Sequence, residues 1–432
     1  MKKQKYYIIT IGCQMNKSDS ERASGILQEK GYGEANDYKQ ADLVILNTCG
    51  VRQTAEDRVY GLIPKIKKEN PKAKIILTGC LSKRADVKKR LENNIDIWLP
   101  ITDLLKLPSK LNLSFSKFNK NNYLNIGPKY NSLFKAFVPI GNGCDNFCSY
   151  CVVPHARGRE IYRSAGDILN EVRNLARLGY KEITLIAQNV NSYAENDKQK
   201  IAGKKNVKFA ELLNMVNNIE GNFWIRFATS HPKDMSDKLI NVIAKGEKIC
   251  EHIHLPAQAG DNGVLKAMNR KYTVEHYKNL IKKIRRAIPD ASITTDIIVG
   301  FPGEARKQFN NTVKLFKEIK FDMAYIARYS SRPGTAAERL KDDVPAEEKK
   351  QREEKLMRIL RKTALANNRR YAGKVEEILV EGKNKRGEWY GRTRTNKNVK
   401  IKNAKSKRIL GKFIKVKITN ARDFGLVGAL ME

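Results

Sequence analysis

Short, nearly continuous apolar runs alternate with amphipathic helical patterns along the first hundred residues. Strands that are apolar throughout are typical of parallel sheets whose two faces are both covered by helices. One helical pattern, with Ser18 or Asp19 as its N-cap, follows the first run, and a second pattern spans residues 54–70. The alternation predicts a doubly wound parallel α/β domain over residues 1–118. The apolar runs themselves occupy residues 6–11, 42–48 and 74–79.

The same alternation returns in the middle of the chain, where six apolar runs are separated by helical patterns. Six strand–helix units predict a (β/α)6 partial barrel over residues 130–360, smaller than the eight-fold barrel. The segment 101–130, rich in Lys, Asn, Ser and Leu, is expected to be a connector. The expected strands are 134–140, 182–187, 224–229, 252–255, 292–299 and 324–329, and the expected helices are 165–179, 209–217, 235–244, 274–288 and 304–318.

The pattern changes again after a charged helical segment at 345–368. Short apolar runs separated by turns follow, and they predict a small, OB-like β-barrel over residues 363–430. The chain as a whole is therefore expected to be an α/β multidomain protein. The runs are 374–380, 388–393, 397–401 and 412–419.

The charge balance points to a polyanionic partner. The 432 residues include 83 Lys and Arg against 46 Asp and Glu, a formal net charge of +37. From Thr363 onward there are 18 Lys and Arg against 6 Asp and Glu, so the excess gathers on the predicted barrel. Basic residues interleaved with Trp389, Tyr390 and Phe413 favour RNA as the partner.

Cys144, Cys148 and Cys151 form a C-x3-C-x2-C motif on a glycine-rich turn after the first strand of the middle domain. Three thiolates leave one iron of a cubane iron–sulfur cluster open for another ligand, which favours catalysis. A closed zinc site would need a fourth ligand, and His155 could supply it. Seven cysteines, an odd number, fit a reducing cytoplasm better than a secreted disulfide scaffold.

Each of the first three strands ends in a cysteine: Cys13, Cys49 and Cys80. The carboxyl ends of parallel strands meet at one edge of the sheet, where ligands bind, so these thiols can converge on a second metal centre. The alternative is that each is a small buried residue. Cys250 stands alone and is expected to be structural.

Polar residues end several strands of the predicted partial barrel, where (β/α) barrels bind their ligands. Gln188 and Asn189 follow the second strand, Gln258 follows the fourth, and Asp296 and Gly300 lie in or after the fifth. Together they predict a site for a small polar cofactor, and Gly300 permits close approach of the backbone. Taken singly, each is equally typical of a turn or a helix cap.

Arg157 and Arg159 follow the cysteine motif closely and could contact phosphates or form a solvated face. His231 is expected to be a turn or cap residue. The apolar run at 6–11 is too short for the core of a signal peptide, and no stretch is long enough to span a membrane, so no membrane partner is expected.

The chain resembles the radical S-adenosylmethionine (SAM) methylthiotransferases over essentially its whole length, with a methylthiotransferase domain, a radical SAM core and a C-terminal TRAM domain in that order. Residues 14–16 and 392–396 favour the branch that acts on isopentenyladenosine in tRNA. Ala257, Ala259 and Ser331 depart from the family pattern. The motifs that carry the resemblance are 12–16, 47–49, 143–151, 157–160, 188–193 and 391–396.

The resemblance implies installation of a 2-methylthio group on N6-isopentenyladenosine beside the anticodon of tRNA. It implies two [4Fe–4S] clusters, two SAM molecules per turnover, an external one-electron reductant, and a cytoplasmic monomer that contacts the anticodon stem-loop; the sulfur donor is left open. The implied cluster ligands are Cys13, Cys49, Cys80, Cys144, Cys148 and Cys151. The implied SAM contacts are Tyr150, Gln188, Asn189, Gln258, Asp296 and Gly300, and the implied RNA contacts are Arg157, Arg159, Arg392 and Arg394.

Two other functions remain open at this stage. One is a methylthiotransferase for threonylcarbamoyladenosine in tRNA or for a ribosomal protein. The other is a non-catalytic iron–sulfur protein that binds RNA.

Overall fold

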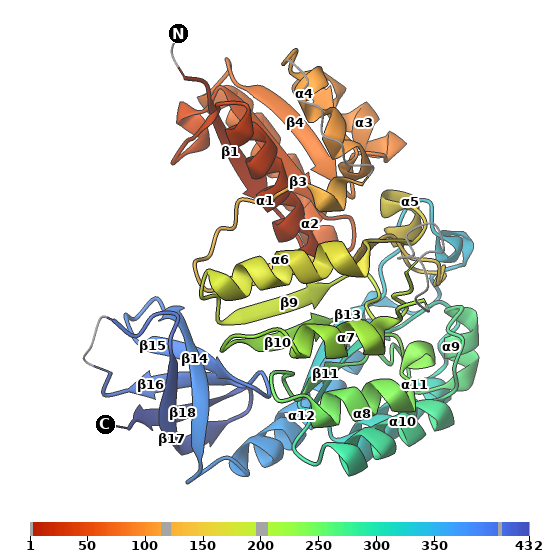
Figure 1. Cartoon of the computed structure of the whole chain (residues 1–432). Coiled ribbons are helices and arrows are strands. Elements are labelled where there is room, and N and C mark those ends of the chain that lie inside the picture. The colour runs from red at the N-terminus through yellow and green to blue at the C-terminus, as the bar shows by residue number, and fades with distance from the viewer. Residues whose placement is uncertain (1–2, 114–121, 196–205, 405–407, 432) are drawn as a thin grey trace.

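The computed structural model describes residues 3–113, 122–195, 206–404 and 408–431. Its first domain is a five-stranded parallel sheet in the order β2-β1-β3-β4-β5 (Figure 1). Apolar clusters lie on both faces, one with Ile26 of α1 and one with Ile63 of α2, so the domain is doubly wound as predicted. The elements are β1 (Lys5–Thr10), α1 (Gln14–Glu29), β2 (Gly33–Glu34), β3 (Leu43–Thr48), α2 (Gln53–Glu69), β4 (Lys74–Gly79), α3 (Ala85–Leu91) and β5 (Ile97–Trp98).

Two details of this domain differ from the sequence-based expectation. Helix α1 begins at Gln14 with Cys13 as its N-cap, so Ser18 and Asp19 both lie inside the helix and neither caps it. The expected connector at 101–130 is partly folded: it includes α4 (Leu107–Lys110), and Leu104 and Leu124 are buried in the same cluster as α1. Its apolar residues are irregularly spaced, which hid their burial. The expected domain boundary at residue 118 falls outside the described residues.

The middle domain contains six parallel strands in sequence order, as the partial barrel requires. The structure divides them into β6-β9-β10 and β11-β12-β13, and backbone hydrogen bonds between Ile225 and both Lys248 and Cys250 join the halves. The main elements are β6 (Lys135–Pro139), α6 (Ala165–Arg177), β9 (Glu182–Ile186), α7 (Phe209–Asn217), β10 (Trp224–Ala228), α8 (Asp237–Lys245), β11 (His252–His254), α10 (Val274–Ala287), β12 (Ser292–Val299), α11 (Arg306–Ile319) and β13 (Met323–Arg328).

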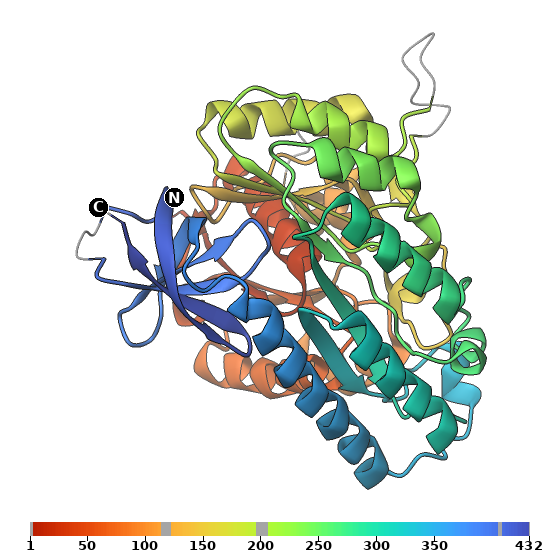
Figure 2. The same cartoon turned by 90° about the horizontal axis from the view of Figure 1, so that it is seen from below.

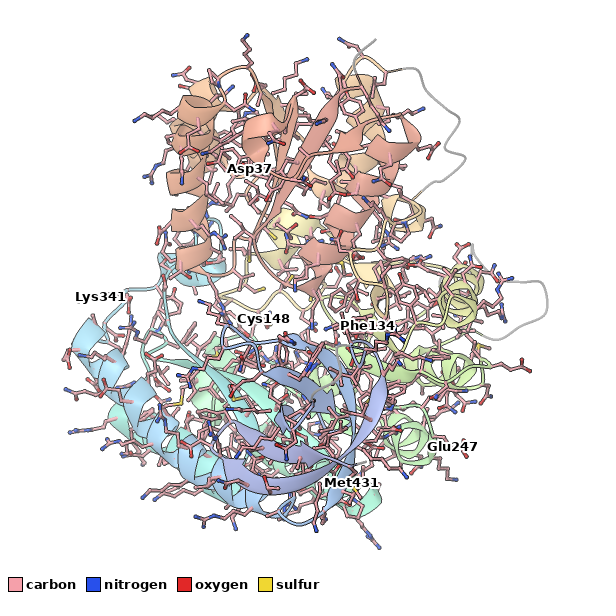
Figure 3. All side chains as sticks on the ribbon, turned by 90° about the vertical axis from the view of Figure 1, so that its left-hand side faces the viewer. Asp37, Phe134, Cys148, Glu247, Lys341 and Met431 are labelled. Carbon is pink, nitrogen blue, oxygen red and sulfur yellow. The ribbon has the colours of Figure 1, made fainter. Side chains whose placement is uncertain are left out.

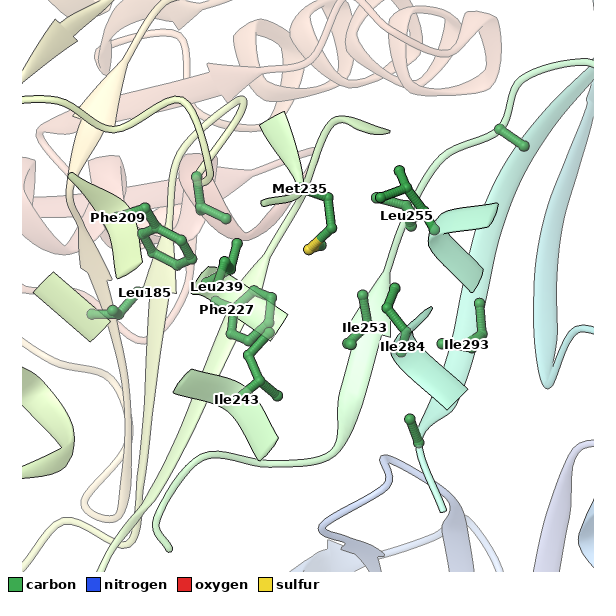
Figure 4. Close-up of a cluster of buried hydrophobic side chains, with 14 of the residues drawn as sticks. Leu185, Phe209, Phe227, Met235, Leu239, Ile243, Ile253, Leu255, Ile284 and Ile293 are labelled. Carbon is green, nitrogen blue, oxygen red and sulfur yellow. The ribbon is translucent and has the colours of Figure 1, made fainter. Parts of the chain in front are cut away.

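The two faces of these strands differ in chemistry because successive side chains point to opposite sides. One face packs against the helices through buried apolar residues such as Leu185, Phe227 and Ile253, which belong to one cluster with Leu239 of α8 (Figure 4). The opposite face, called here the inner face, is largely polar. It carries Glu182, Thr184, Arg226, His252, His254, Thr294, Asp296 and Tyr325.

The C-terminal domain is a closed five-stranded barrel in the order β14-β15-β16-β18-β17, reached through the long helix α12 (Ala346–Arg369) (Figure 2). The sequence predicted its first four strands and missed the last. That strand contains Gly425 and Gly428, which weaken a strand pattern. The strands are β14 (Val375–Lys383), β15 (Trp389–Thr393), β16 (Asn398–Lys402), β17 (Phe413–Arg422) and β18 (Gly425–Leu430).

The C-terminal barrel is fastened to the inner face by buried charges. Glu182 accepts hydrogen bonds from Arg226 Nε at 2.6 Å and from Arg392 of the barrel at 2.8 Å. Burial alone would raise the pKa of Glu182, but Arg226 and Arg392 hold it below its ordinary value. Trp224 packs on Phe413 with ring centroids 4.7 Å apart. The barrel thus closes one end of the partial barrel. Among the described residues, no helix is both long and apolar enough to cross a membrane.

Replacing Glu182 with Gln leaves Arg226 and Arg392 buried without this carboxylate. Breaking a buried pair on one side costs about 3 kcal/mol of unfolding free energy, so the thermal midpoint should fall by several degrees. The control is Glu388→Gln, which removes a surface partner of Lys400 and should leave the midpoint unchanged. Equal midpoints for both variants would contradict the buried-charge fastening.

Candidate metal centre

Cys144, Cys148 and Cys151 lie on one loop that follows β6 and the short strand β7 (Gly141–Asn142). Burial and the neighbouring thiols raise the pKa of Cys151 to about 12. The loop turns through Gly143, whose φ is +86° and where an added Cβ would lie 2.1 Å from the Arg159 carbonyl oxygen. The chain therefore needs glycine at this point to bring the three thiols together.

Side chains from elsewhere in the chain hold this loop in place. Gln188, expected to bind a cofactor, accepts a hydrogen bond from the Gly143 N–H at 2.7 Å. Asn269 donates to the Phe147 carbonyl at 2.8 Å, and Arg270 Nη1 lies 3.4 Å from Cys148 Sγ. The sequence analysis missed Asn269 and Arg270, because they belong to no motif and reach the loop only through the fold.

Cys13, Cys49 and Cys80 also converge, as the strand pattern predicted. They follow β1, β3 and β4, which are adjacent in the sheet. Burial, Cys80 and Cys13 raise the pKa of Cys49 to about 11, so the three thiols interact electrostatically. An added Cβ on Gly12 would lie 2.9 Å from the Cys49 Cβ, which explains the glycine beside Cys13.

A buried amide clamps two of these cysteine loops together. Asn16 Oδ1 lies 3.2 Å from Cys13 Sγ, while Asn16 Nδ2 donates to Asn47 Oδ1 at 2.8 Å and to the Thr48 carbonyl at 3.0 Å. The Thr48 carbonyl also accepts from the Cys80 N–H at 2.9 Å. Asn16 and Thr48 therefore connect all three strand ends.

The donor chemistry of both trios fits a cluster. Within the described ranges, no group of three or more Cys, His, Asp or Glu side chains is arranged to hold a single metal ion. A cubane differs, because each thiolate binds a different iron and the ligands lie farther apart than those of one zinc. His155, the possible zinc ligand, is exposed and lines a cavity of about 310 Å³ together with Cys80 of the other trio.

The expected SAM contacts do not all face one space. Tyr150 lies on the cysteine loop itself, between Cys148 and Cys151: desolvation raises its pKa, and the two cysteines act in the same direction. Gln258 is buried and its backbone bonds to Asp296 and Ile298. Asp296 is on the inner face. Gly300 packs against the Lys349 side chain, which would lie 2.3 Å from an added Cβ. Glycine is therefore needed here for contact with Lys349, and not for the expected approach of the backbone to a ligand.

Three buried polar atoms near the ends of β9 and β10 lack partners. Asn189 donates to Asp234 Oδ2 at 2.9 Å, but its Oδ1 has no hydrogen-bond partner among the described residues. The hydroxyls of Thr229 and Ser230 are also buried, and neither has a hydrogen-bond partner in the part of the chain that the structure describes. Buried polar groups normally have partners, so these atoms fit a site for a polar ligand such as SAM.

His231 serves as a cap, as expected. Its Nδ1 accepts from the Lys233 N–H at 3.2 Å, and burial lowers its pKa to about 2.

The arginines expected to contact RNA are mostly engaged within the protein. Arg157 is 2% exposed and pairs with Asp19 at 2.7 Å. Arg392 pairs with Glu182, and Arg394 pairs with Glu251 at 2.7 Å. Only Arg159 among the four expected arginines, 72% exposed, presents its guanidinium to solvent. A charged motif does not reveal which carboxylate the fold will bring to it.

The aromatic residues expected to face RNA are divided in the same way. Trp389 is buried, and Phe413 packs on Trp224 at the interface with the middle domain. Tyr390 alone of the three lines a surface groove. Cys250 is buried against Trp224 and Leu379, as a structural residue would be.

The two cysteine trios lie on domains that pack against each other, with Cys148 near their junction (Figure 3), and a buried ion pair joins these domains. Arg157 follows Cys151 in the middle domain, whereas its partner Asp19 lies on α1, whose N-cap is Cys13. Cys80 and Cys13 contribute to the raised pKa of Arg157, so its guanidinium lies near the trio of Cys13, Cys49 and Cys80. The Asp19–Arg157 pair thus connects the supports of both trios.

Comparison with known proteins agrees with this division of the chain. Residues 138–316 match the model of the Radical SAM superfamily, residues 5–100 match Uncharacterized protein family UPF0004, and residues 369–431 match the TRAM domain. Proteins named tRNA-2-methylthio-N(6)-dimethylallyladenosine synthase are similar along the full chain. The protein from Carboxydothermus hydrogenoformans is 44% identical, covering 100% of both chains, and that from Syntrophomonas wolfei is 42% identical, covering 99% of this chain and 97% of the relative.

Solved structures resemble the fold at low identity. A radical S-adenosylmethionine methyltransferase, TsrM, from Kitasatospora setae, with cobalamin and a [4Fe-4S] cluster bound, has a TM-score of 0.51 and 12% identity over 87% of this chain and 81% of that chain. The cobalamin-dependent S-adenosylmethionine radical enzyme OxsB gives 0.54 and 12% over 83% and 56%. The sequence relatives decide the family: the chain belongs to the radical SAM methylthiotransferases whose curated members are named tRNA-2-methylthio-N(6)-dimethylallyladenosine synthase.

Proposed function

We propose that this protein installs a 2-methylthio group on N6-isopentenyladenosine beside the anticodon of tRNA. The observation that carries the proposal is the pair of cysteine trios on two domains joined by the buried Asp19–Arg157 pair. Cys144, Cys148 and Cys151 lie within the Radical SAM match. Cys13, Cys49 and Cys80 lie in the domain that precedes it along the chain. The full-length relatives support the substrate class.

Cys144, Cys148 and Cys151 would hold the [4Fe–4S] cluster of the radical SAM site. Such a cluster supplies one-electron cleavage of SAM to a 5′-deoxyadenosyl radical, which an inert aromatic C–H bond requires. Gln188 and Asn269 keep the loop in position, and Arg270 places a positive charge beside Cys148. Asn189, Thr229 and Ser230 offer unpartnered polar atoms to SAM.

Cys13, Cys49 and Cys80 would hold a second [4Fe–4S] cluster that carries the sulfur. A second SAM per turnover would then supply the methyl group. Asn16 keeps the cysteine loops together, and the Arg157 guanidinium lies close enough to Cys80 and Cys13 to interact favourably with their thiolate charge. An external one-electron reductant and a sulfur donor complete the reaction, and we propose a cytoplasmic monomer.

The outer surface of the C-terminal barrel offers a place for RNA. A groove of about 830 Å³ is lined by Tyr390 and Phe424 together with Lys400 and Arg422. Phe424 is 38% exposed although it is a large apolar residue. Aromatic rings beside cations suit unpaired bases and their phosphates. This groove replaces Arg392 and Arg394 as the proposed RNA contact of the barrel.

Deleting the gene should remove 2-methylthio-N6-isopentenyladenosine from tRNA, which mass spectrometry of tRNA nucleosides detects. The purified enzyme should also form 5′-deoxyadenosine from SAM with a strong reductant. Loss of a threonylcarbamoyladenosine derivative, or of a ribosomal protein modification, would instead identify the other methylthiotransferase substrates. A protein that forms no 5′-deoxyadenosine would be a non-catalytic iron–sulfur protein.

Iron analysis tests the two-cluster proposal. Anaerobically purified wild-type protein should contain roughly eight irons, and either triple Cys→Ala variant should contain about four, because each trio holds one cubane. The matched control is Cys250→Ala, which should keep the full content. If the Cys13/Cys49/Cys80 variant loses no iron, the second cluster is ruled out.

If the groove binds RNA, a double substitution in its lining should weaken RNA binding. Arg422→Ala with Phe424→Ala should weaken binding of a tRNA anticodon stem-loop at least fivefold, from loss of about 1 kcal/mol or more of stacking and one phosphate contact. The slope of log K against log salt should become shallower by about one. Lys374→Ala with Val375→Ala also removes one cation and one exposed apolar residue from the barrel, but outside the groove, and should change neither quantity.

A further inference from the structure

The inner face of β11, β12 and β13 carries a group of side chains that neither cysteine trio uses. His254, Asp296 and Tyr325 lie on three adjacent strands and point to the same side, because Asp296 pairs with Tyr325 in register and His254 pairs with Thr294. The His254 and Tyr325 rings are 5.9 Å apart in an edge-to-face arrangement. They are called here the inner-face triad.

A hydrogen-bond chain fixes the orientation of this triad. Thr294 Oγ1 lies 3.0 Å from both His252 Nε2 and His254 Nδ1, and His254 Nε2 lies 3.4 Å from Asp296 Oδ2. The hydroxyl has one proton, so it donates to one ring and accepts from the other. With Nε2–H of a neutral His254 directed at Asp296, Thr294 donates to His254 and accepts from His252. The carboxylate is thereby held in one position while its other acceptor sites stay free.

Exposure separates the triad from the other charges of the inner face. Glu182 of the inner face pairs with Arg392 of the C-terminal barrel, and Asp322, just before β13, pairs with Lys397 of the same barrel. The Asp296 side chain is 41% exposed, and within the described parts of the chain no Lys or Arg pairs with it. Tyr325, a large side chain of β13, is 47% exposed. The triad is therefore open to a ligand.

The inner-face triad lies between the C-terminal barrel and the loop that carries Cys49. Burial and Asp296 raise the pKa of Tyr325, and the two cations that oppose this shift are Arg52 and Arg392. Arg52 follows Cys49 by three residues, and its neighbour Gln53 accepts a hydrogen bond at 2.7 Å from Arg332, just after β13. A ligand on Tyr325 would lie beside the loop that carries Cys49.

We propose that the inner-face triad binds the target purine of the RNA substrate. The Tyr325 ring stacks on the base, Asp296 accepts a hydrogen bond from its exocyclic N–H, and Arg52 contacts a phosphate of the same strand. The inference rests on the proposed function, and it moves Asp296 from the cofactor to the substrate. SAM is better served by the unpartnered atoms of Asn189, Thr229 and Ser230 on the other half of the sheet.

The test compares two anticodon stem-loops that differ at the target position. One carries N6-isopentenyladenosine and is called here the adenosine RNA; the other carries O6-isopentenylinosine, in which an ether oxygen replaces the exocyclic N–H, and is called the purine RNA. Binding is measured with the reconstituted full-length protein without reductant. Wild type should prefer adenosine by about tenfold, the value of one hydrogen bond to a charged acceptor. Asp296→Ala should bind adenosine RNA as weakly as purine RNA, so that the preference disappears.

Tyr325→Leu should weaken binding of both RNAs equally, by fivefold or more, because every purine loses its stacking partner. Tyr325→Phe should bind like wild type, which also shows that the strand tolerates substitution. The matched control is Arg328→Ala, an exposed residue of the same strand on the opposite face, which should change neither affinity.

SAM binding by the same variants distinguishes the two roles of Asp296, and it should be unchanged in Asp296→Ala. If that variant loses SAM binding and keeps its preference for adenosine, Asp296 is a cofactor residue and the inference is overturned. Wild-type preference and affinity in all variants would overturn it as well, with the proposed function intact. A wild-type protein that binds neither stem-loop would contradict the proposed function itself.

Discussion

The spacing between the two cysteine trios depends on a small set of buried charges. Asp19 and Arg157 are each at most 2% exposed, and burial raises the pKa of Asp19 while Arg157 opposes the shift. Beside them, Glu171 accepts from Arg163 at 2.7 Å and from Arg22 at 3.2 Å. Charges taken out of water are stable only when paired in good geometry, so the two domains can pack in few other ways. The proposed reaction, with a radical generated at one trio and sulfur carried at the other, would require such a fixed distance.

The C-terminal barrel is held by the same kind of interaction. Arg392 and Arg394 occupy carboxylates of the middle domain, which leaves the outer groove around Tyr390 and Phe424 to face a partner. The barrel is therefore a fixed part of the enzyme body, and RNA bound to it is held at a set position relative to the inner face. On that face the charges nearest the barrel are paired, whereas Asp296 and Tyr325 remain exposed.

The polar residues of the site have two kinds of task. Gln188, Asn16 and Asn269 hold the cysteine loops through backbone and amide contacts, so their amides are already occupied in forming the site. Asn189, Thr229 and Ser230 retain unpartnered atoms, and Asp296 retains free acceptor positions, so these groups can meet ligands. This difference separates residues that build the centre from residues that recognise what enters it.

The sequence alone determined the three domains, the order of their strands and the convergence of Cys13, Cys49 and Cys80, because apolar periodicity and the polarity of parallel strands are local properties. It could not determine whether Arg157, Arg392 and Arg394 would be paired with carboxylates or exposed, or what roles Asn269 and Arg270 have. Arg157 meets its carboxylate 138 residues away along the chain, and Arg392 meets Glu182 at a separation of 210. Only the tertiary structure decides whether a charged side chain finds water, a ligand or a buried partner, because burial and ion pairing depend on what the fold brings next to it.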